Sequence, residues 1–401
     1  MEPTTINIEF ELSSPQELAA EKISDTLIQN GYTAYFVGGY VRDKILGKSA
    51  KDIDIACSAT PDEIEDLFDK TIAVGKSFGV MVVVQDGEMI ELATFRKDGG
   101  YQDGRRPESI EFCGAYEDAR RRDFTMNALF YDPQKKEIID YVGGHADLLK
   151  GEINVIGKAE ERFSEDYLRM LRAIRFSARF NFPIEEGAFQ VICSNADFIL
   201  KISNERIFNE INAMFCGPDP KFAIQLLKDA GFLKLIFNAG DLADLGSFSS
   251  CDPETAWAVF FHSIDYNSEK AVEKLKELKV SNIMINAVKF CMEPVRLDDK
   301  ADYLHLFSHK HFAKYLDFIR IASIKDKASK ELFDELLQRY RSYGFPRELV
   351  KAFVSGDELQ ELGLQPGKEF GRIIKTLYRM QLNDELKTKE EALLFVKKEY
   401  F

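Results

Sequence analysis

The feature that most constrains the fold of this chain is a change of pattern near residue 160. Of its 25 glycines, 15 lie at or before Gly157, between short β-rich runs at 34–38, 51–57, 80–85, 88–95 and 137–142. From Glu160 onward, apolar residues recur at spacings of three and four, as in 267–278 and 389–400. Short β-rich runs between turn residues indicate strands, and spacings of three and four indicate helices. We therefore predict an α/β or α+β N-terminal part followed by an all-α remainder.

The length and composition are those of a globular protein with several domains. The chain has 401 residues, more than one hydrophobic core usually organises, and is 45% hydrophobic and 30% charged. No run approaches the roughly 18 apolar residues that a spanning helix needs. The first 11 residues also lack the basic and then apolar pattern of a signal peptide. We expect a cytoplasmic protein without a membrane partner.

Cysteine and charge usage narrow the possible partners. The six cysteines are scattered without a C-x-x-C pair, which predicts reduced packing residues rather than a disulfide scaffold or a zinc site. A metal site at His305, His309 and His311 is disfavoured by their spacing of four and then two. With a net charge of −14, the electrostatic field of the molecule as a whole would repel a polyanion. A nucleic-acid partner must therefore meet a local basic surface.

Two glycines follow an apolar run in the segment 36–43 (FVGGYVRD). A helix is predicted to begin near Val41. Backbone amides at a helix start bind anions, and the Arg42 guanidinium would add a fixed positive charge. Gly38, Gly39 and Arg42 therefore predict a phosphate site. The alternative interpretation is an ordinary turn before a helix.

Asp52-Ile53-Asp54 lies in a strand pattern ten residues later. Alternation along a strand sends Asp52 and Asp54 to one face. Two neighbouring carboxylates raise each other's pKa unless a cation lies between them, and Mg²⁺ prefers such oxygen ligands. The alternative interpretation is a solvated strand face.

The order of glycine pair, helix and D-x-D resembles the nucleotidyltransferase superfamily. The residues that follow resemble the second class of the tRNA nucleotidyltransferase and poly(A) polymerase family. The resemblance runs from about Tyr35 to Ile211, and beyond about Pro218 it is only to a helical tail of similar length. Its elements are 36–57 (FVGGYVRDKILGKSAKDIDIAC), 74–80 (VGKSFGV), 91–107 (ELATFRKDGGYQDGRRP), 121–129 (RRDFTMNAL), 140–148 (DYVGGHADL), 165–176 (EDYLRMLRAIRF) and 203–210 (SNERIFNE).

The resemblance implies a fold and a division into domains. It implies a polymerase β-like α/β nucleotidyltransferase head with a small mixed sheet at 1–142. A helical neck with a nucleotide-selecting helix would follow at 143–216, then a helical body at 217–295 and a helical, RNA-binding tail at 296–401.

The resemblance also implies an activity. It implies an enzyme that adds CCA to the 3′ end of tRNA without a nucleic-acid template, using CTP and ATP. Two Mg²⁺ ions would be held by Asp52 and Asp54. Glu91, on a neighbouring strand, would be a third carboxylate that reaches the metals or activates the hydroxyl; otherwise it is solvated or paired with an arginine. The partner is the tRNA acceptor end, and no protein partner is implied.

Several further residues match the family's nucleotide-binding elements. Arg122 and Asp123 match its ribose-binding pair, since a carboxylate can accept hydrogen bonds from the 2′- and 3′-hydroxyls. Asn127 is a further contact, or else a capping or packing amide. Arg172 and Arg175 would lie near the triphosphate, whereas Arg179 would face solvent or RNA.

Asp166 and Arg169 match the pair that selects the base. At i and i+3 on a helix they would share one face and offer an acceptor and a donor. Cytosine and adenine both present an amine beside an unprotonated ring nitrogen, so one such pair admits both, and uracil and guanine present the reverse pattern. Glu205 and Arg206 would brace this helix.

The sequence leaves three related activities open. Complete CCA addition leads. Family members that lack the loop pattern of 96–107 tend to add only cytidines, so the resemblance implies addition of adenosine as well. Addition of the terminal A alone is the second interpretation, because no residue known to us separates the two. Polyadenylation is third, because 74–80 lacks the doubled basic residue after Gly75 that bacterial poly(A) polymerases tend to show. An RNA-binding descendant without catalysis is disfavoured, because all the expected metal and nucleotide groups are present.

Overall fold

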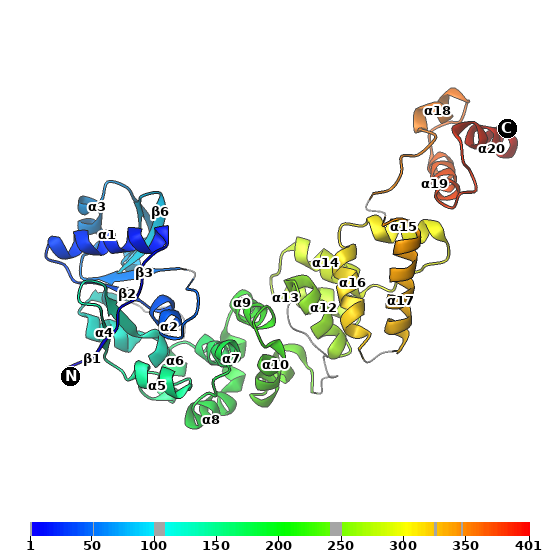
Figure 1. Cartoon of the computed structure of the whole chain (residues 1–401). Coiled ribbons are helices and arrows are strands. Elements are labelled where there is room, and N and C mark those ends of the chain that lie inside the picture. The colour runs from blue at the N-terminus through cyan, green and yellow to red at the C-terminus, as the bar shows by residue number, and fades with distance from the viewer. Residues whose placement is uncertain (1, 51, 100–108, 241–250, 325–326, 346–347) are drawn as a thin grey trace. The chain divides into compact units, whose positions relative to one another are not determined.

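The computed structural model describes residues 2–50, 52–99, 109–240, 251–324, 327–345 and 348–401. The chain forms two compact units, Met1–Gly240 and Asp241–Phe401, and each is described by itself (Figure 1). Most of the loop predicted at 96–107 lies outside the described residues. Its first part is a strand instead, because Arg96–Asp98 pairs with Ile110–Phe112.

An eight-stranded mixed sheet forms the centre of the first unit (Figure 1). The strand order is β1-β10-β9-β2-β3-β6-β5-β4, and of these neighbours only β3 and β6 run parallel. The strands are β1 (Thr4–Asn7), β2 (Ala34–Val37), β3 (Asp54–Cys57), β4 (Thr71–Gly75), β5 (Val80–Gln85), β6 (Glu88–Thr94), β9 (Leu129–Asp132) and β10 (Glu137–Asp140), with β7 (Arg96–Asp98) and β8 (Ile110–Phe112) in a separate ribbon. The expected α+β head with a mixed sheet is confirmed.

Helix α1 (Pro15–Gln29) packs against this sheet, contacting β2, β3, β5 and β6. Its start is set by a capping box: Ser14 accepts a hydrogen bond from the Glu17 amide, and Glu17 accepts one from the Ser14 amide. Four apolar side chains of α1 are fully buried: Ala19, Ala20, Ile23 and Leu27. A second apolar cluster includes Val37, Ala56, Phe95, Ala119, Ala128 and Phe130. Helix α4 (Ala115–Arg121), which carries Ala119, lies on the side of the sheet opposite α1 (Figure 1).

The rest of the first unit is helical. Its other helices are α2 (Gly39–Ile45), α3 (Pro61–Leu67), α5 (Gly144–Lys150), α6 (Ala159–Glu165), α7 (Leu168–Phe180), α8 (Glu186–Ser194), α9 (Asn204–Phe215), α10 (Pro220–Asp229) and α11 (Phe232–Phe237), with 3-10 turns η1 (Lys76–Phe78), η2 (Thr125–Asn127) and η3 (Ala196–Lys201). Helix α7 packs on α9 and α10 through one apolar face that includes Leu171 and Ile174. Because α10 and α11 belong to this unit, the compact units divide inside the segment 217–295.

The described residues of the second unit contain helices and no strand, so the expected helical remainder is confirmed there. The helices are α12 (Pro253–Ser263), α13 (Ser268–Glu277), α14 (Asn282–Met292), α15 (Lys300–Ser308), α16 (Phe312–Ala322), α17 (Lys327–Ser342), α18 (Gly356–Glu361), α19 (Lys368–Leu382) and α20 (Lys389–Tyr400). Helix α12 buries Trp257, Phe260 and Phe261 and packs on α14 and α16. A separate apolar cluster, which includes Leu359, Leu377 and Val396, joins α18, α19 and α20.

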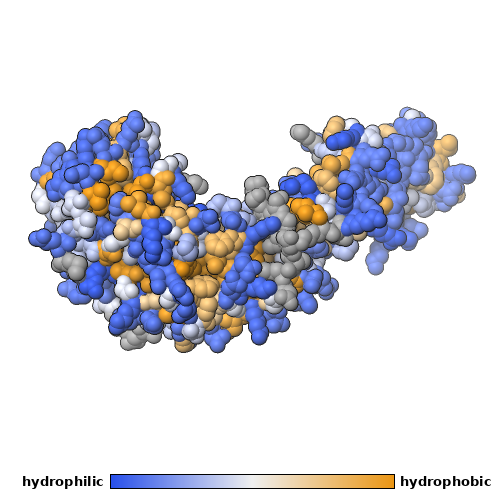
Figure 2. Space-filling model, turned by 60° about the horizontal axis from the view of Figure 1, so that its bottom comes forward, coloured by the Kyte–Doolittle hydropathy of each residue, from blue (hydrophilic) through white to orange (hydrophobic). Residues whose placement is uncertain are grey.

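The surface is mostly polar. The face drawn in Figure 2 is largely hydrophilic, with hydrophobic residues visible between the polar ones. Within the described ranges, no helix combines the length and apolar character that crossing a membrane requires.

Candidate active site

Two carboxylates stand side by side at the junction of β3 and β6. Asp54 is the first residue of β3 and lies in register with Glu91 of β6. Paired residues on neighbouring strands point to the same face of a sheet, so the two side chains are neighbours. Both residues are exposed, whereas Ile53 and Ile55 are buried. The strand begins at Asp54, so Asp52 precedes it and does not belong to the strand as predicted.

The charge balance around Asp54 is negative. Desolvation by the surrounding protein and then the Glu91 carboxylate raise the pKa of Asp54 to about 6; Asp52 raises it further, and Arg122 opposes them. Asp54 nevertheless keeps an exposed surface, so this carboxyl group is crowded by protein but open to ligands. A carboxylate whose neighbours destabilise its ionised form favours a cation beside it.

The Gly38–Gly39 turn lies against two guanidinium groups. Gly38 has φ +68° and ψ −131°, a conformation that a side chain would strain, and α2 begins at the next residue. A Cβ at Gly38 would lie 3.6 Å from Arg122 Nη1, and one at Gly39 would lie 3.4 Å from Arg42 Nη2. The glycines thus leave space between the backbone and these cations. Helix α2 has only seven residues, so the arginines carry most of the positive charge here.

Arg42 is buried and fully engaged with the protein. Its Nε donates to Asp43 Oδ1 at 2.8 Å, and its Nη1 donates to Asn127 Oδ1 at 2.5 Å. Its guanidinium also lies over the rings of Phe176 and Phe180, at 5.4 and 4.7 Å from the ring centroids. Rather than leaving its guanidinium group free for a ligand, Arg42 connects α2 to η2 and α7.

Asp123 lies at the centre of a hydrogen-bonded chain. Its Oδ1 accepts from Asn127 Nδ2 at 3.2 Å and from the Phe124 amide at 2.9 Å. Its Oδ2 accepts from Arg172, at 2.7 Å from Nε and 2.6 Å from Nη2. Although burial opposes ionisation, Arg172 and Asn127 hold the pKa of Asp123 below its usual value. Asn127 therefore links Arg42 to Asp123, and Arg172 joins α7 to the same carboxylate.

Arg122 is held by a different acid. It donates to Asp118 Oδ2 from Nη2 at 2.9 Å and to the Asn127 carbonyl oxygen from Nη1 at 3.3 Å. Asp118 is 1% exposed and also binds Arg121. Arg122 thereby lies near both Asp54 and the glycine turn. It is linked to Asp123 through Asn127, whose carbonyl oxygen accepts from Arg122 and whose Nδ2 donates to Asp123 Oδ1.

The prediction that Asp166 and Arg169 share one face of a helix is wrong. Asp166 lies between α6 and α7 with extended backbone (φ −150°, ψ 104°), and its Oδ1 accepts from the Leu168 amide at 3.0 Å. Its carboxylate also accepts from Arg206 Nη2 at 2.6 Å. Because Asp166 ends α6 and precedes Tyr167, the N-cap of α7, it lies outside the helix that carries Arg169, and the i,i+3 argument fails for this pair.

Arg169 has partners of its own. Its Nη1 donates to Glu165 Oε2 at 2.5 Å and to the Arg162 carbonyl oxygen at 2.9 Å. Each of the two groups expected to read the base is thus fixed by another residue. Of the two predicted braces, Arg206 contacts Asp166, whereas Glu205 is exposed.

Sequence reasoning missed several acids that organise these arginines. Glu210 accepts from Arg175 Nε at 2.6 Å and lies 3.8 Å from Arg172 Nη1. Asp43 accepts from Arg42 and also from Arg179 Nη2, at 2.9 Å. A signal for Glu210 was available, because it lies four residues after Arg206 and hence on the same face of α9.

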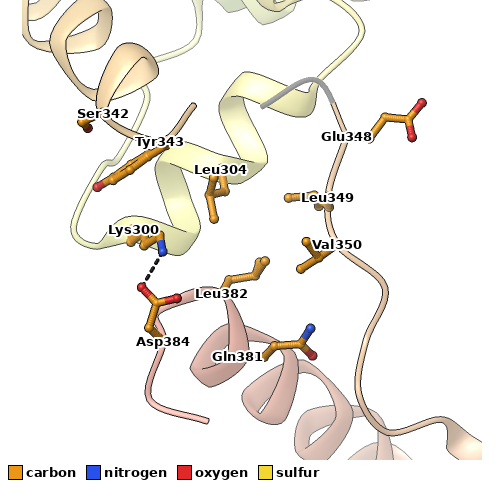
Figure 3. A pocket seen from close by; sticks show the side chains of 10 residues that line it. All are labelled: Lys300, Leu304, Ser342, Tyr343, Glu348, Leu349, Val350, Gln381, Leu382 and Asp384. Carbon is orange, nitrogen blue, oxygen red and sulfur yellow. Dashed lines mark hydrogen bonds and ion pairs between the residues drawn. The ribbon is translucent and has the colours of Figure 1, made fainter. Parts of the chain in front are cut away.

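The described ranges contain cavities but no cluster of metal ligands. Within them, no three His, Cys, Asp or Glu side chains converge on one point as a metal cluster would. One cavity of about 350 Å³ lies in the first unit, lined by the end of α7 and the joint between α9 and α10. Another of about 380 Å³ lies in the second unit, between Lys300 and Leu304 on α15, Leu382 at the end of α19, and Val350 (Figure 3).

Comparison with known proteins places three family models along the chain. The model of the poly(A) polymerase head domain matches residues 34–154, and that of a "Probable RNA and SrmB- binding site of polymerase A" matches 181–242. The model of tRNA nucleotidyltransferase domain 2 matches 248–396.

Curated relatives match over nearly the whole length. The CCA-adding enzyme of Pediococcus pentosaceus is 34% identical over 392 residues, which cover 95% of this chain and 97% of that protein. The CCA-adding enzyme of Lactococcus lactis subsp. lactis is 35% identical over 399 residues, covering 94% and 96%.

Solved structures agree with this likeness. The Bacillus stearothermophilus CCA-adding enzyme in complex with CTP has a TM-score of 0.82 and 29% identity, covering 96% of this chain and 98% of that one. The Thermotoga maritima CCA-adding enzyme complexed with tRNA shares the fold, with a TM-score of 0.64 at 20% identity and 99% coverage of both chains.

Proposed function

Because this chain belongs to the tRNA nucleotidyltransferase and poly(A) polymerase family, we propose that it adds CCA to the 3′ end of tRNA, using CTP and ATP. It is an RNA 3′-terminal nucleotidyltransferase, and it needs no nucleic-acid template. Its relatives at 33–35% identity over most of the chain are CCA-adding enzymes. The substrate suggests that it acts in the cytoplasm.

The observation that carries the chemistry is the in-register pair of Asp54 and Glu91, with Asp52 two residues before, close to a glycine turn that faces two guanidinium groups. Phosphoryl-transfer sites need negative ligands for metal ions and positive groups for the phosphates. Both occur within one region of the head, and this combination supports nucleotidyl transfer over simple RNA binding.

Magnesium fits the donors present. The pKa of Asp54 is raised by crowding and by its acidic neighbours, which a divalent ion would relieve. Mg²⁺ is commonly bound by one or two carboxylates together with substrate phosphates, so a cluster of three protein ligands is not required. Asp52 and Asp54 would hold two ions, with Glu91 beside them. When bound, the ions lower the pKa of the RNA 3′-hydroxyl and neutralise charge on the triphosphate.

The protein's own groups would bind and orient the nucleotide. The space left by Gly38 and Gly39 would admit phosphate oxygens close to Arg122. Arg42, held by its hydrogen bond to Asn127, would support the turn. Arg172 and Arg175 supply further positive charge from α7, and Asp123 would accept the ribose hydroxyls. For Asp123 to do so, Arg172 must exchange its carboxylate partner for the triphosphate.

Base choice would rest on Asp166 and Arg169. Arg206 and Glu165 fix these two groups in place, which suits them to admit cytosine and adenine and reject uracil and guanine. Asp166→Ala or Arg169→Ala should therefore allow UTP and GTP to be incorporated, and unchanged selectivity would refute this assignment.

Three RNAs distinguish the possible activities. The purified protein is given tRNA that ends at the discriminator base, the same tRNA ending in CC, and an unrelated single strand, each with CTP, ATP and Mg²⁺. We expect three nucleotides on the first and one on the second. Extension of the CC form alone would indicate A-addition, and extension of the unrelated strand would indicate polyadenylation. Asp54→Ala should abolish every product while leaving the fold intact.

A further inference from the structure

A cavity of about 350 Å³ lies beside the last two turns of α7. One wall is Arg175, Ala178 and Arg179, which share a face of that helix at spacings of three and four. The other wall comes from the end of α9 and the start of α10, residues 213–219 without Phe215. A volume of this size accommodates one nucleotide unit, because small-ligand sites begin near 300 Å³.

The two arginines at the cavity keep donors available. Arg175 uses Nε for Glu210, and Arg179 uses Nη2 for Asp43. For the other guanidinium nitrogens of both residues, the described part of the chain supplies no further hydrogen-bond acceptor. Arg179 is also the more open, with 42% of its side chain exposed. Two guanidinium groups with free N–H groups on one wall suit a phosphate.

Positive charge is concentrated next to this wall. Arg42, Lys48 and Arg179 all lie over the ring of Phe180, at 4.7, 4.7 and 5.0 Å from its centroid. Burial lowers the pKa of Arg42, and Arg179 and Arg175 lower it further, which shows that the cations act on one another despite Asp43.

Three carboxylates lie at the cavity or on its arginines. Glu210 and Asp43 pair with Arg175 and Arg179, and Asp219 lines the cavity, where its Oδ1 accepts from the Phe222 amide at 2.9 Å. The carboxyl end of α9 and the amino end of α10 meet at the same wall, and their partial charges oppose each other. What the cavity offers an anion is therefore the set of guanidinium N–H groups without an acceptor in the described part of the chain, rather than an excess of positive charge.

We propose that this cavity binds a phosphate of the RNA substrate, upstream of the 3′ end that is extended. The proposal rests on the proposed function, which supplies the RNA. Arg172, which faces Asp123, and Arg179 are separated by about 10 Å along α7 at 1.5 Å per residue. A phosphate at Arg179 would thus be separate from the nucleotide at Arg172, as an upstream RNA phosphate must be. Met214 and Pro218 offer apolar surface to the adjoining ribose.

The test is Arg179→Gln in the full-length protein, with Arg179→Lys as the charge-conserving variant. Lys22→Gln on α1 is the matched control, because Lys22 is an exposed cation in the same unit with one carboxylate partner, Asp86. The affinity for tRNA lacking CCA is measured at several salt concentrations, and the KM for CTP is measured at saturating tRNA. Thermal melting of each variant checks the fold.

We expect Arg179→Gln to weaken tRNA binding roughly tenfold and to reduce the slope of log affinity against log salt by about 0.7 to 0.9. Arg179→Lys should restore most of that slope, Lys22→Gln should match the wild type, and the KM for CTP should stay within about twofold. A raised KM for CTP with unchanged tRNA affinity would assign the phosphate to the free nucleotide instead and overturn the proposal.

Two further outcomes would also overturn the proposal. Unchanged tRNA affinity and salt slope would show that no RNA phosphate binds there. A salt slope reduced as much in Arg179→Lys as in Arg179→Gln, at an unchanged melting temperature, would show that the positive charge of this residue does not bind an RNA phosphate. Failure of the proposed function is separately visible, because tRNA binding can be measured in a protein that adds no nucleotide.

Discussion

At the scale of single residues, the candidate site holds its acids in two different ways. Asp123 has an ordinary strong partner, Arg172, which keeps its pKa low. Asp54 has the opposite environment, with other carboxylates as neighbours and its pKa raised to about 6. An arrangement that raises the energy of the ionised form is typical of a site that trades stability for function.

Asp54→Asn should therefore stabilise the fold while abolishing transfer. Asp54 holds its proton more tightly in the folded protein than in the unfolded chain, so its contribution to stability is fully present below about pH 4 and is lost as pH rises through about 6. After allowance for the exposure of Asp54, we expect a gain of about 1 kcal/mol at pH 8 and none at pH 4. Urea unfolding of the variant and the wild type at the two pH values measures this gain in the free energy of unfolding.

The matched control is Asp86→Asn. Asp86 is an exposed acid whose pKa is lowered by its hydrogen bond to Lys22, so it should show no gain at pH 8. Equal gains in both variants would indicate a general effect of net charge rather than the environment of Asp54.

Arg206→Gln should loosen base choice without touching the base. Arg206 holds the Asp166 carboxylate at 2.6 Å, and its loss would free that side chain to turn. We expect the preference for CTP over UTP, measured as a ratio of kcat/KM, to fall roughly tenfold, because the variant loses both charge-assisted hydrogen bonds from Arg206 to the Asp166 carboxylate. Glu205→Gln, an exposed neighbour, should keep the ratio of the wild type. A selective Arg206→Gln enzyme would contradict a positioning role.

At the scale of elements, sequence patterns located several strands and helices but not the elements with which they pair or pack. The runs at 80–85 and 389–400 coincide with β5 and α20, because local periodicity sets such elements. The register of Asp54 with Glu91 could not be predicted, because it joins residues 37 positions apart through a parallel pairing that neither segment encodes alone. The helical position predicted for Asp166 was wrong for a related reason: local periodicity does not reveal the break at Asp166 between α6 and α7.

Glu17 shows how one residue can tie elements together. Besides capping α1, it accepts from Tyr40 OH at 2.9 Å and lies 2.5 Å from Lys44 Nζ, both on α2. Burial opposes ionisation, yet these bonds and two backbone amides lower the pKa of Glu17 to about 2. The start of α1 is thereby joined to the helix that follows the glycine turn.

Glu17→Gln should destabilise the first unit by about 1–3 kcal/mol at neutral pH, the value of a lost charged hydrogen-bond network. Because its folded pKa is lowered, Glu17 contributes its stabilisation above about pH 4.5 and loses it as pH falls toward 2. The difference between variant and wild type in urea unfolding should accordingly shrink with acid. A difference that is constant from pH 7 to pH 3 would show a purely steric effect.

At the scale of the whole molecule, the chain has two compact units with separate cores. The second unit carries His309 and the buried His311, whose pKa values are both lowered, first by desolvation and then by Lys310. Histidines of this kind stabilise a fold above about pH 6.5 and weaken it as pH falls, since the unfolded chain binds the proton more readily.

We therefore expect the second unit to unfold at a lower temperature at pH 5.5 than at pH 7.5, relative to the first. Scanning calorimetry resolves the two transitions and measures their separation at each pH. His311→Gln should reduce the pH dependence of that separation, whereas His305→Gln, an exposed change on α15, should leave it as in the wild type. A single transition at all pH values would contradict independent units.

Arg172 and Asp123 form an ion pair with each other in this structure. If, as we propose, Arg172 binds the triphosphate and Asp123 the ribose, this ion pair must break before either group can contact a nucleotide. A nucleoside without phosphates offers nothing to the arginine and must break the pair uncompensated, whereas a triphosphate draws it away and uncovers the carboxylate. Cytidine should thus compete with CTP far more weakly than its missing phosphate contacts alone would account for.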